Sequence, residues 1–198
     1  LEAGNLVGIP TETVYGLGAD ATNGRAVAKV FEVKGRPTFN PLISHVCGIE
    51  HAQSLAYFPQ LALDLAEKYW PGPLTFVLPR LARCPAHDLV TAGLKTIAIR
   101  APGHAVARQL LMAFNKPIAA PSANPSGELS PTCADHVAQS IGEDIDMILD
   151  GGRCAVGLES TVVEVTNDAV YLLRPGSILE EDIIAVSYTH LRAHETLP

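Results

Sequence analysis

The feature that most constrains the fold is the alternation of short apolar runs with amphipathic stretches along the 198 residues. Short apolar runs bounded by proline or glycine are typical of buried strands, and apolar residues three and four positions apart are typical of helices. The predicted strands cover residues 6–9, 42–46, 74–78, 96–100, 117–120, 147–149, 161–165 and 170–173. The predicted helices begin near residues 23, 61, 104, 130 and 177. This order predicts one α/β domain over residues 1–186.

Local signals indicate how these elements begin, end and pair. Asn23 predicts the cap of a helix that Gly35 ends. Ser130 before proline predicts another helix start, and Ser177 with Glu180 predicts a capping box. The two strands on either side of Asn167 and Asp168 predict a hairpin, and hairpins mixed with crossover connections favour a mixed sheet.

Composition excludes several classes of protein. The net charge of −7 disfavours a general nucleic-acid binder, and no stretch approaches the roughly 20 apolar residues of a membrane span. Four widely spaced cysteines predict reduced thiols and a cytoplasmic protein, with no zinc site. Residues 187–198 continue no periodic pattern, so we expect a non-native or disordered tail. The start, Leu1-Glu2-Ala3, resembles no signal peptide and lacks an initiator Met, which suggests a truncated N-terminus.

Common catalytic motifs are weak or absent. Residues 16–21, Gly-Leu-Gly-Ala-Asp-Ala, match the glycine spacing of a dinucleotide-binding turn, but positions 38–44 hold no acidic residue to bind a ribose. A turn in which glycines allow close backbone packing is the preferred interpretation. The sequence contains no Walker-type loop, no His-Glu-x-x-His and no Gly-x-Ser-x-Gly.

Cationic and polar residues at the ends of elements are candidate ligands for anions. Lys34 and Arg36, with Asn40, follow a predicted helix, where they are either solvated charges or a phosphate site. Arg100 and Arg174 end predicted strands, where each either snorkels to solvent or holds an anion. Small and polar residues 119–127 follow a buried strand and form either a polar turn or a nucleotide-binding loop. His45, alone in a strand, is more typical of a structural hydrogen bonder than of a catalyst.

Seven short motifs, in order over about residues 5–180, resemble the YrdC-like family. They are Pro10-Thr11-Glu12-Thr13-Val14-Tyr15-Gly16-Leu17, Lys34-Gly35-Arg36-Pro37 with Asn40-Pro41-Leu42, Trp70-Pro71-Gly72-Pro73-Leu74-Thr75, Arg100-Ala101-Pro102, Ser122-Ala123-Asn124, Glu159-Ser160-Thr161-Val162-Val163 and Arg174-Pro175-Gly176. Each motif alone is modest, and their common order makes the resemblance specific.

The resemblance implies a twisted, open mixed sheet with flanking helices around a large concave active site. It also implies synthesis of L-threonylcarbamoyladenylate. In that reaction the amine of threonine captures bicarbonate or CO2, the carbamate oxygen attacks the α-phosphate of ATP, and pyrophosphate leaves. A separate transferase complex then moves the threonylcarbamoyl group to the tRNA adenosine beside the anticodon. A weak contact with tRNA is also expected.

By the same resemblance, Lys34 and Arg36 are the expected catalytic residues. The expected ATP ligands are Lys34, Arg36, Asn40, Thr96, Ser122, Asn124, Ser130 and Arg174. The expected threonine ligands are Thr13, His45, Arg100, Ala120 and Ser160, where Arg100 suits the carboxylate and Ala120 contributes its backbone. Mg²⁺ is expected to arrive with ATP, and no protein metal site is expected.

The sequence departs from the family pattern in two places, and two alternative functions are still to be distinguished. The family has a further element before the first strand, and a longer subfamily continues past Arg174-Pro175-Gly176 into a second domain. One rival is a module that forms carbamoyl-adenylate from carbamoyl phosphate, which needs no carboxylate clamp. The other is a non-catalytic RNA-binding module, which the acidic charge and the lack of an aromatic-basic stripe disfavour.

Overall fold

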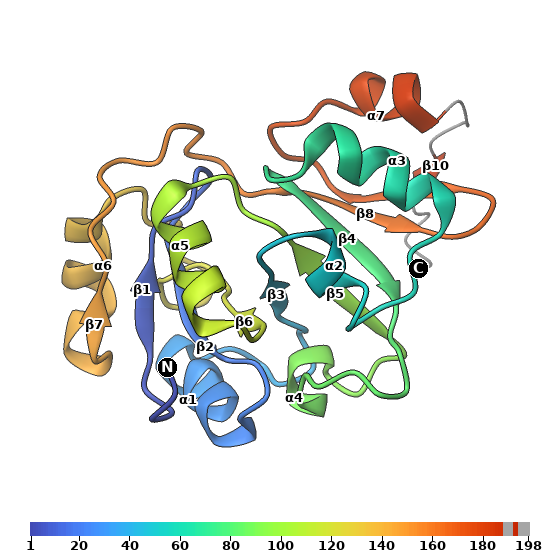
Figure 1. The fold of residues 1–198 in the computed structure, drawn as a ribbon. Helices are drawn as coiled ribbons and strands as arrows, with labels where there is room; N and C mark the ends of the chain where they lie inside the picture. Colours follow the sequence, from blue (N-terminus) through green and yellow to red (C-terminus); the bar gives the residue numbers. More distant parts are fainter. Residues whose placement is uncertain (188–191, 194–198) are drawn as a thin grey trace.

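The computed structural model describes residues 1–187 and 192–193, and its strands form one ten-stranded sheet (Figure 1). In sheet order these are β10 (Arg192–Ala193), β9 (Val170–Arg174), β8 (Thr161–Val165), β4 (Leu74–Pro79), β5 (Thr96–Arg100), β3 (Ile43–His45), β6 (Ile118–Ala119), β2 (Gly16–Asp20), β1 (Val7–Ile9) and β7 (Met147–Ile148). The sheet contains parallel pairs (β3 with β5, β4 with β8, β1 with β7) as well as antiparallel pairs, so it is mixed, as the sequence predicts.

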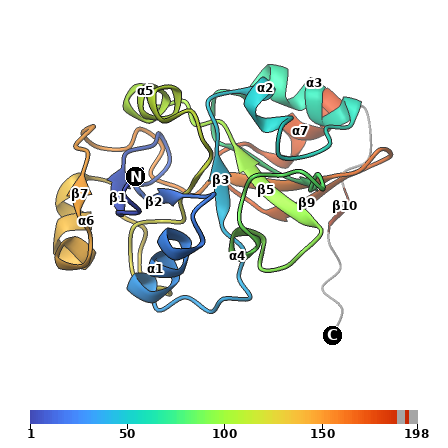
Figure 2. The same cartoon turned by 60° about the horizontal axis from the view of Figure 1, so that its bottom comes forward.

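Helices lie on both faces of this sheet. They are α1 (Gly24–Lys34), α2 (Ile49–Ala52), α3 (Gln60–Tyr69), α4 (Asp88–Thr91), α5 (Ala105–Phe114), α6 (Ala134–Ile141) and α7 (Glu180–Ser187), with a short 3₁₀ helix at Gly142–Asp144. Figure 2 shows α2, α3, α5 and α7 on one side of the sheet and α1 and α4 on the other, and α6 stands at the β7 edge. The described part of the chain is therefore a layered α/β fold.

The buried residues explain this arrangement. The main core joins the sheet to α1 and α3 through fully buried side chains such as Val30, Leu65 and Phe76. A smaller cluster, including Ile9, Leu111 and Ile118, packs α5 onto the β1–β6 half of the sheet. Burying apolar area of this kind is the main term that stabilises a fold.

Most predicted elements are confirmed within one or two residues, including the hairpin of β8 and β9. Asn23 caps α1, since its side-chain oxygen accepts from the backbone N–H groups of Arg25 (3.1 Å) and Ala26 (3.3 Å). Gly35 ends the helix with a left-handed backbone, φ 57°. This turn sends Arg36 away from the helix axis.

Three local predictions are wrong. Residues 16–20 form strand β2, antiparallel to β1, rather than a turn, because β1 and β6 pair with its two edges. Ser130 caps no helix: α6 begins at Ala134, and the Ser130 hydroxyl donates to Glu159 instead. The Ser177 hydroxyl has no partner among the described residues, so the capping box with Glu180 does not form.

The expected tail, 187–198, is described only in part. Ser187 ends α7, and Arg192–Ala193 form β10 parallel to β9. The other residues of that range lie outside the described residues, so the interpretation as a tail stays a prediction. Within the described part of the chain, no helix has the length and apolar character needed to cross a membrane.

Candidate active site

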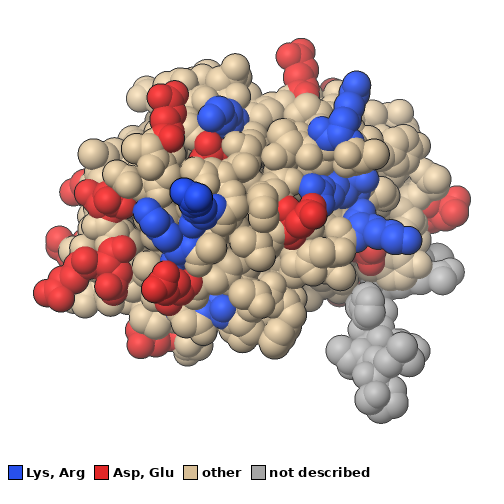
Figure 3. Space-filling model, turned by 90° about the horizontal axis from the view of Figure 1, so that it is seen from below, with Lys and Arg blue, Asp and Glu red and all other residues tan. Residues whose placement is uncertain are grey.

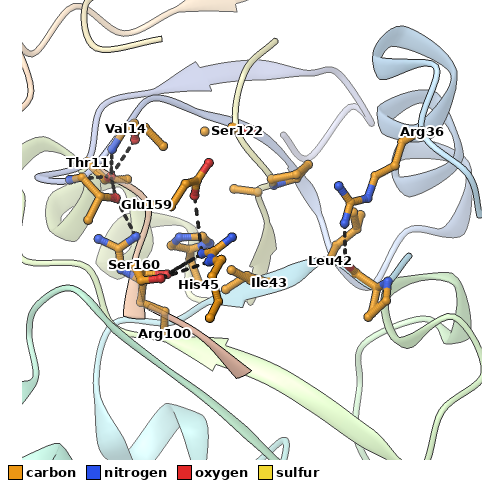
Figure 4. Close-up of a pocket in the computed structure, with 16 residues that line it drawn as sticks. Thr11, Val14, Arg36, Leu42, Ile43, His45, Arg100, Ser122, Glu159 and Ser160 are labelled. Carbon is orange, nitrogen blue, oxygen red and sulfur yellow. Dashed lines mark hydrogen bonds and ion pairs between the residues drawn. The ribbon is translucent and has the colours of Figure 1, made fainter. Parts of the chain in front are cut away.

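A pocket of about 520 Å³ lies where the two halves of the sheet meet (Figure 4). Three arginines line it, Arg36, Arg100 and Arg174, and we call it the cationic pocket. Its other lining residues are Thr11, Thr13, Val14, Gly16, Pro41, Leu42, Ile43, His45, Ala120, Pro121, Ser122, Glu159 and Ser160. Eight of the predicted ligands therefore meet in one place: Thr13, Arg36, His45, Arg100, Ala120, Ser122, Ser160 and Arg174.

Strand register explains why residues so distant in sequence meet. His45 lies opposite Arg100, because β3 and β5 run parallel and end at the same edge. Strand β8 runs parallel to β4, which is antiparallel to β5, so the start of β8 reaches the edge where β5 ends. Ser160 stands just before β8, and Arg174 ends β9 opposite Val162. The edge therefore gathers one histidine, two arginines and a serine.

Arg100 is the most constrained of the three arginines, with only 3 % of its surface exposed. Its guanidinium donates to Glu12 Oε1 (2.5 Å), Thr13 Oγ1 (2.8 Å) and the Gly72 carbonyl (3.2 Å). An arginine side chain has five N–H groups. Two of them therefore have no partner in the described part of the chain, and together they suit a carboxylate, which accepts two parallel hydrogen bonds.

His45 lies beside Arg100 as a neutral ring. Burial and the neighbouring Arg100 lower the pKa of His45 to about 3. The side-chain atom Nδ1 is buried and has no hydrogen-bond partner among the described residues. The ring also borders a small apolar cavity behind the pocket, lined by Ile9, Ala107 and Leu110 among others. The Nδ1 atom of His45 can therefore form one hydrogen bond with a ligand, and the neutral ring adds no charge to the pocket.

The low pKa of His45 predicts an acid-dependent loss of stability. Between pH 6.5 and 3 the unfolded chain binds a proton at this histidine and the folded chain does not, so stability falls as the pH falls through this window. The contribution is at most about 1.4 kcal/mol per pH unit. We expect His45→Gln to lose less stability than wild type between pH 7 and 5, measured by urea unfolding. Equal losses in both proteins would show that His45 is readily protonated in the fold.

Lys34 and Arg36 make different hydrogen bonds, and their action on phosphates as one site stays a prediction. The Lys34 ammonium is buried and donates to the backbone carbonyls of Ser122 (2.5 Å) and Asn124. Burial and Arg36 lower the pKa of Lys34 to about 8. Arg36 donates to the carbonyls of Asn40 (3.2 Å) and Pro41 (3.0 Å). Lys34 thus anchors the backbone of residues 122–124. Arg36 lines the cationic pocket on the side opposite Arg100 (Figure 4).

Arg174 stands over the start of β8. Its Nε and Nη2 donate to the Ser160 carbonyl (3.2 and 3.0 Å), and Nη2 also donates to Ser160 Oγ (3.1 Å). Ser160 Oγ is in turn 2.8 Å from Thr75 Oγ1, which fixes it. Burial lowers the pKa of Arg174, and the nearby carboxylate of Glu159 partly offsets this.

Four predicted ATP ligands, Asn40, Thr96, Asn124 and Ser130, are not among the lining residues of the cationic pocket. Thr96 begins β5 and lies opposite Pro79 of β4, at the other end of β5 from Arg100. Asn40 contributes a carbonyl to Arg36. Asn124 and Ser130 line a second, open hollow of about 1330 Å³, which we call the outer hollow. Their roles as ligands, like those of all the predicted residues, stay predictions.

Two acidic residues with evident contacts received no role from the sequence. Glu12 binds Arg100 and accepts from the backbone N–H of Gly103 (2.9 Å). Glu159 accepts from the Ser130 hydroxyl (2.7 Å) and lies 3.5 Å from Arg174 Nη2. Both stand inside motifs already singled out, so an acidic residue within a cation-rich motif set is the signal that could have found them.

The charges elsewhere are dispersed. Figure 3 shows Lys and Arg on the face it presents in several separate groups, interleaved with Asp and Glu. This face therefore offers no continuous basic surface of the kind that general nucleic-acid binders carry.

The fold and the cationic pocket define an α/β protein whose mixed sheet carries, where several of its strands end, a pocket lined by three arginines. The Sua5/YciO/YrdC family model, described as "Telomere recombination", matches residues 1–176. The chain belongs to this family, which confirms the resemblance read from its motifs.

Curated relatives carry a consistent name. A threonylcarbamoyl-AMP synthase of Pyrococcus abyssi is 48 % identical over 184 residues, 92 % of this chain and 54 % of that protein. The threonylcarbamoyl-AMP synthase of Bacillus subtilis is 48 % identical over 190 residues, 94 % of this chain and 54 % of that protein. A putative threonylcarbamoyl-AMP synthase of Methanocaldococcus jannaschii is 33 % identical and covers 88 % of this chain and 81 % of that one. The chain thus spans about half the length of the first two.

Solved structures agree on the fold. Sua5 of P. abyssi in complex with L-threonine has a TM-score of 0.92 and 47 % identity, over 97 % of this chain and 56 % of that one. YciO of E. coli has a TM-score of 0.81 over 92 % of this chain and 88 % of that one, and at 22 % identity it supports the fold alone.

Proposed function

We propose that this chain carries the site of an L-threonylcarbamoyladenylate synthase. The observation that supports it most is the buried Arg100 guanidinium, two of whose N–H groups have no partner among the described residues. It shares one pocket with Thr13, His45 and Ser160 and with the other two arginines, Arg36 and Arg174. A carboxylate at Arg100 and phosphates near the other two arginines fit an amino acid and a nucleotide held together. The similarity to a Sua5 protein complexed with L-threonine supports the same substrate.

The proposed chemistry needs positioning more than acid–base catalysis. Bicarbonate or CO2 combines with the threonine amine to give a carbamate, which is already anionic. A carbamate oxygen then forms a bond to the α-phosphorus of ATP, and the bond from that phosphorus to the bridging oxygen breaks, releasing pyrophosphate. Holding the two reactants in line supplies much of the rate. Arg100 would fix the threonine end, and Arg36 and Arg174 would stabilise the phosphate charge.

Mg²⁺ is proposed as a companion of ATP, not as a resident metal. Within the described residues there is no group of three or more His, Cys, Asp or Glu that could hold a metal ion, and Glu159 is the one carboxylate among the lining residues of the cationic pocket. Mg²⁺ commonly binds through substrate phosphates with one or two carboxylates, so this donor set fits it only as a nucleotide complex. Bound there, it would supply additional positive charge at the phosphates.

Partners and location follow from the same proposal. The acyl-adenylate must pass to a transferase complex that modifies a tRNA adenosine, and a weak contact of this chain with tRNA would assist that step. We also propose a cytoplasmic location, supported by four free cysteine thiols.

Pyrophosphate release from ATP tests the proposal. We expect release only when threonine and bicarbonate are both present, and loss of release when either is omitted, because the nucleophile forms from the two together. Carbamoyl phosphate in place of threonine and bicarbonate is expected to support no adenylate formation. Adenylate formed from carbamoyl phosphate alone would favour the rival acyl donor. A folded chain that binds RNA but consumes no ATP under any combination would favour the RNA-binding module.

A further inference from the structure

Glu159 is out of place in a pocket that we propose to bind a triphosphate. The cationic pocket has three arginines and this one carboxylate among its lining residues. A carboxylate beside phosphate groups repels them, and like charges placed together weaken binding. A carboxylate at this position therefore opposes the phosphate binding that we propose, and its presence calls for a physical explanation.

The contacts of Glu159 offer an explanation for its presence in the pocket. Its oxygen Oε1 accepts from the Ser130 hydroxyl at 2.7 Å, and Oε2 lies 3.5 Å from Arg174 Nη2. A hydroxyl and a guanidinium are the donors that also bind phosphate oxygens. The carboxylate thus uses two groups that the nucleotide would need, and the bond to Ser130 joins the wall of the cationic pocket to that of the outer hollow.

A comparison with Glu12 shows that the Glu159 contact is the weaker one. Glu12 has 16 % of its side chain exposed and pairs with Arg100 at 2.5 Å, whereas Glu159 has 35 % exposed and pairs with Arg174 at 3.5 Å. Glu12 also accepts a backbone N–H, which anchors it further. The Glu159 carboxylate is partly exposed and is held by one long ion pair and one hydroxyl hydrogen bond, so it can rotate away from Arg174 at a smaller cost than Glu12 from Arg100.

We propose that Glu159 is a built-in competitor for the phosphate subsite: its carboxylate occupies Ser130 and Arg174 while the site is empty, and an arriving polyphosphate displaces it. This inference rests on the proposed function. The displaced carboxylate then lies close to the bound phosphates, where its charge weakens their binding. The same repulsion weakens the binding of pyrophosphate after the reaction and so favours its release.

Binding measurements without turnover test the competitor role. We would measure the dissociation constants of pyrophosphate and ADP by calorimetry for wild type and Glu159→Gln, once with a chelator and once with Mg²⁺. The glutamine keeps the shape and removes the charge, so pyrophosphate is expected to bind about tenfold tighter without metal. Threonine affinity should change less than about twofold, because Arg100 keeps its contacts. Asp168→Asn, in the turn between β8 and β9, is the matched charge control and should bind like wild type.

Three further variants make the outcome decisive. Glu159→Asp keeps the charge and should not reproduce the tighter binding, and Glu159→Ala should reproduce it if the glutamine variant folds poorly. Unchanged or weaker pyrophosphate binding in the neutral variants would overturn the proposal, and weakening confined to Mg²⁺ would identify Glu159 as a metal ligand instead. If Arg174→Ala lost pyrophosphate binding while the neutral Glu159 variants matched wild type, the nucleotide site would stand and the competitor would not. If wild type bound neither ligand, the proposed function would fail, and the competitor with it.

Discussion

Arg100→Ala is expected to raise the KM for threonine by about 30-fold or more, with little change in the KM for ATP. Truncating one partner of a buried charge pair costs about 2–5 kcal/mol, and each 1.4 kcal/mol is about tenfold in binding. Arg100 is 3 % exposed, and two of its N–H groups have no partner among the described residues. Steady-state pyrophosphate release at varied threonine and varied ATP measures the two constants separately.

The control must separate substrate binding from damage to the fold. Removing Arg100 leaves the Glu12 carboxylate without its ion-pair partner, which destabilises the protein whatever the substrate. The double variant Glu12→Gln with Arg100→Ala removes that charge, so its melting temperature should recover towards wild type while threonine binding stays weak. Equal losses for threonine and ATP, or recovery of threonine binding in the double variant, would show that Arg100 is structural.

Arg36→Ala is expected to lower kcat/KM for ATP by about 10²-fold, with an unchanged melting temperature. Loss of one strong donor to a developing charge costs about 2.7–4 kcal/mol in the transition state. The guanidinium of Arg36 contacts only two backbone carbonyls in the described part of the chain, so the fold should tolerate its removal. Arg36→Lys keeps the charge and loses the planar fork, and it should remain impaired. Arg25→Ala, which removes an exposed cation from the preceding helix α1, is the matched control and should resemble wild type.

Lys34→Ala should behave differently, because Lys34 holds the 122–124 loop. Two carbonyls would lose a buried donor, at about 2 kcal/mol in total, which corresponds to a melting temperature lower by about 5 °C. ATP kinetics should deteriorate with it, since Ser122 would move. Thermal melting of the two alanine variants therefore distinguishes them. Wild-type ATP kinetics in both, with unchanged melting, would show that both are only solvated charges at a helix end.

The sequence determined the elements and the set of residues. Apolar periodicity and proline or glycine boundaries depend on neighbours a few positions apart, so strands such as β4, β5 and β8 were predicted nearly to the residue. The cap at Asn23 and the stop at Gly35 are equally local. Arg100 and Arg174 were selected because their residue type suits anions, and Ser160 was selected through the resemblance to the family; these three meet in one pocket.

Tertiary structure alone decided where each side chain points and what it contacts. Residues 16–20 became a strand because β1 and β6 supplied partners, which no local glycine pattern reveals. Lys34 and Arg36 stand two positions apart, yet Lys34 donates to a carbonyl 88 residues away and Arg36 to a carbonyl four residues away. Glu12 and Glu159 acquired roles only when strand register brought Arg100 and Arg174 beside them. Such contacts depend on distance in space, and pairing across the sheet fixes that distance.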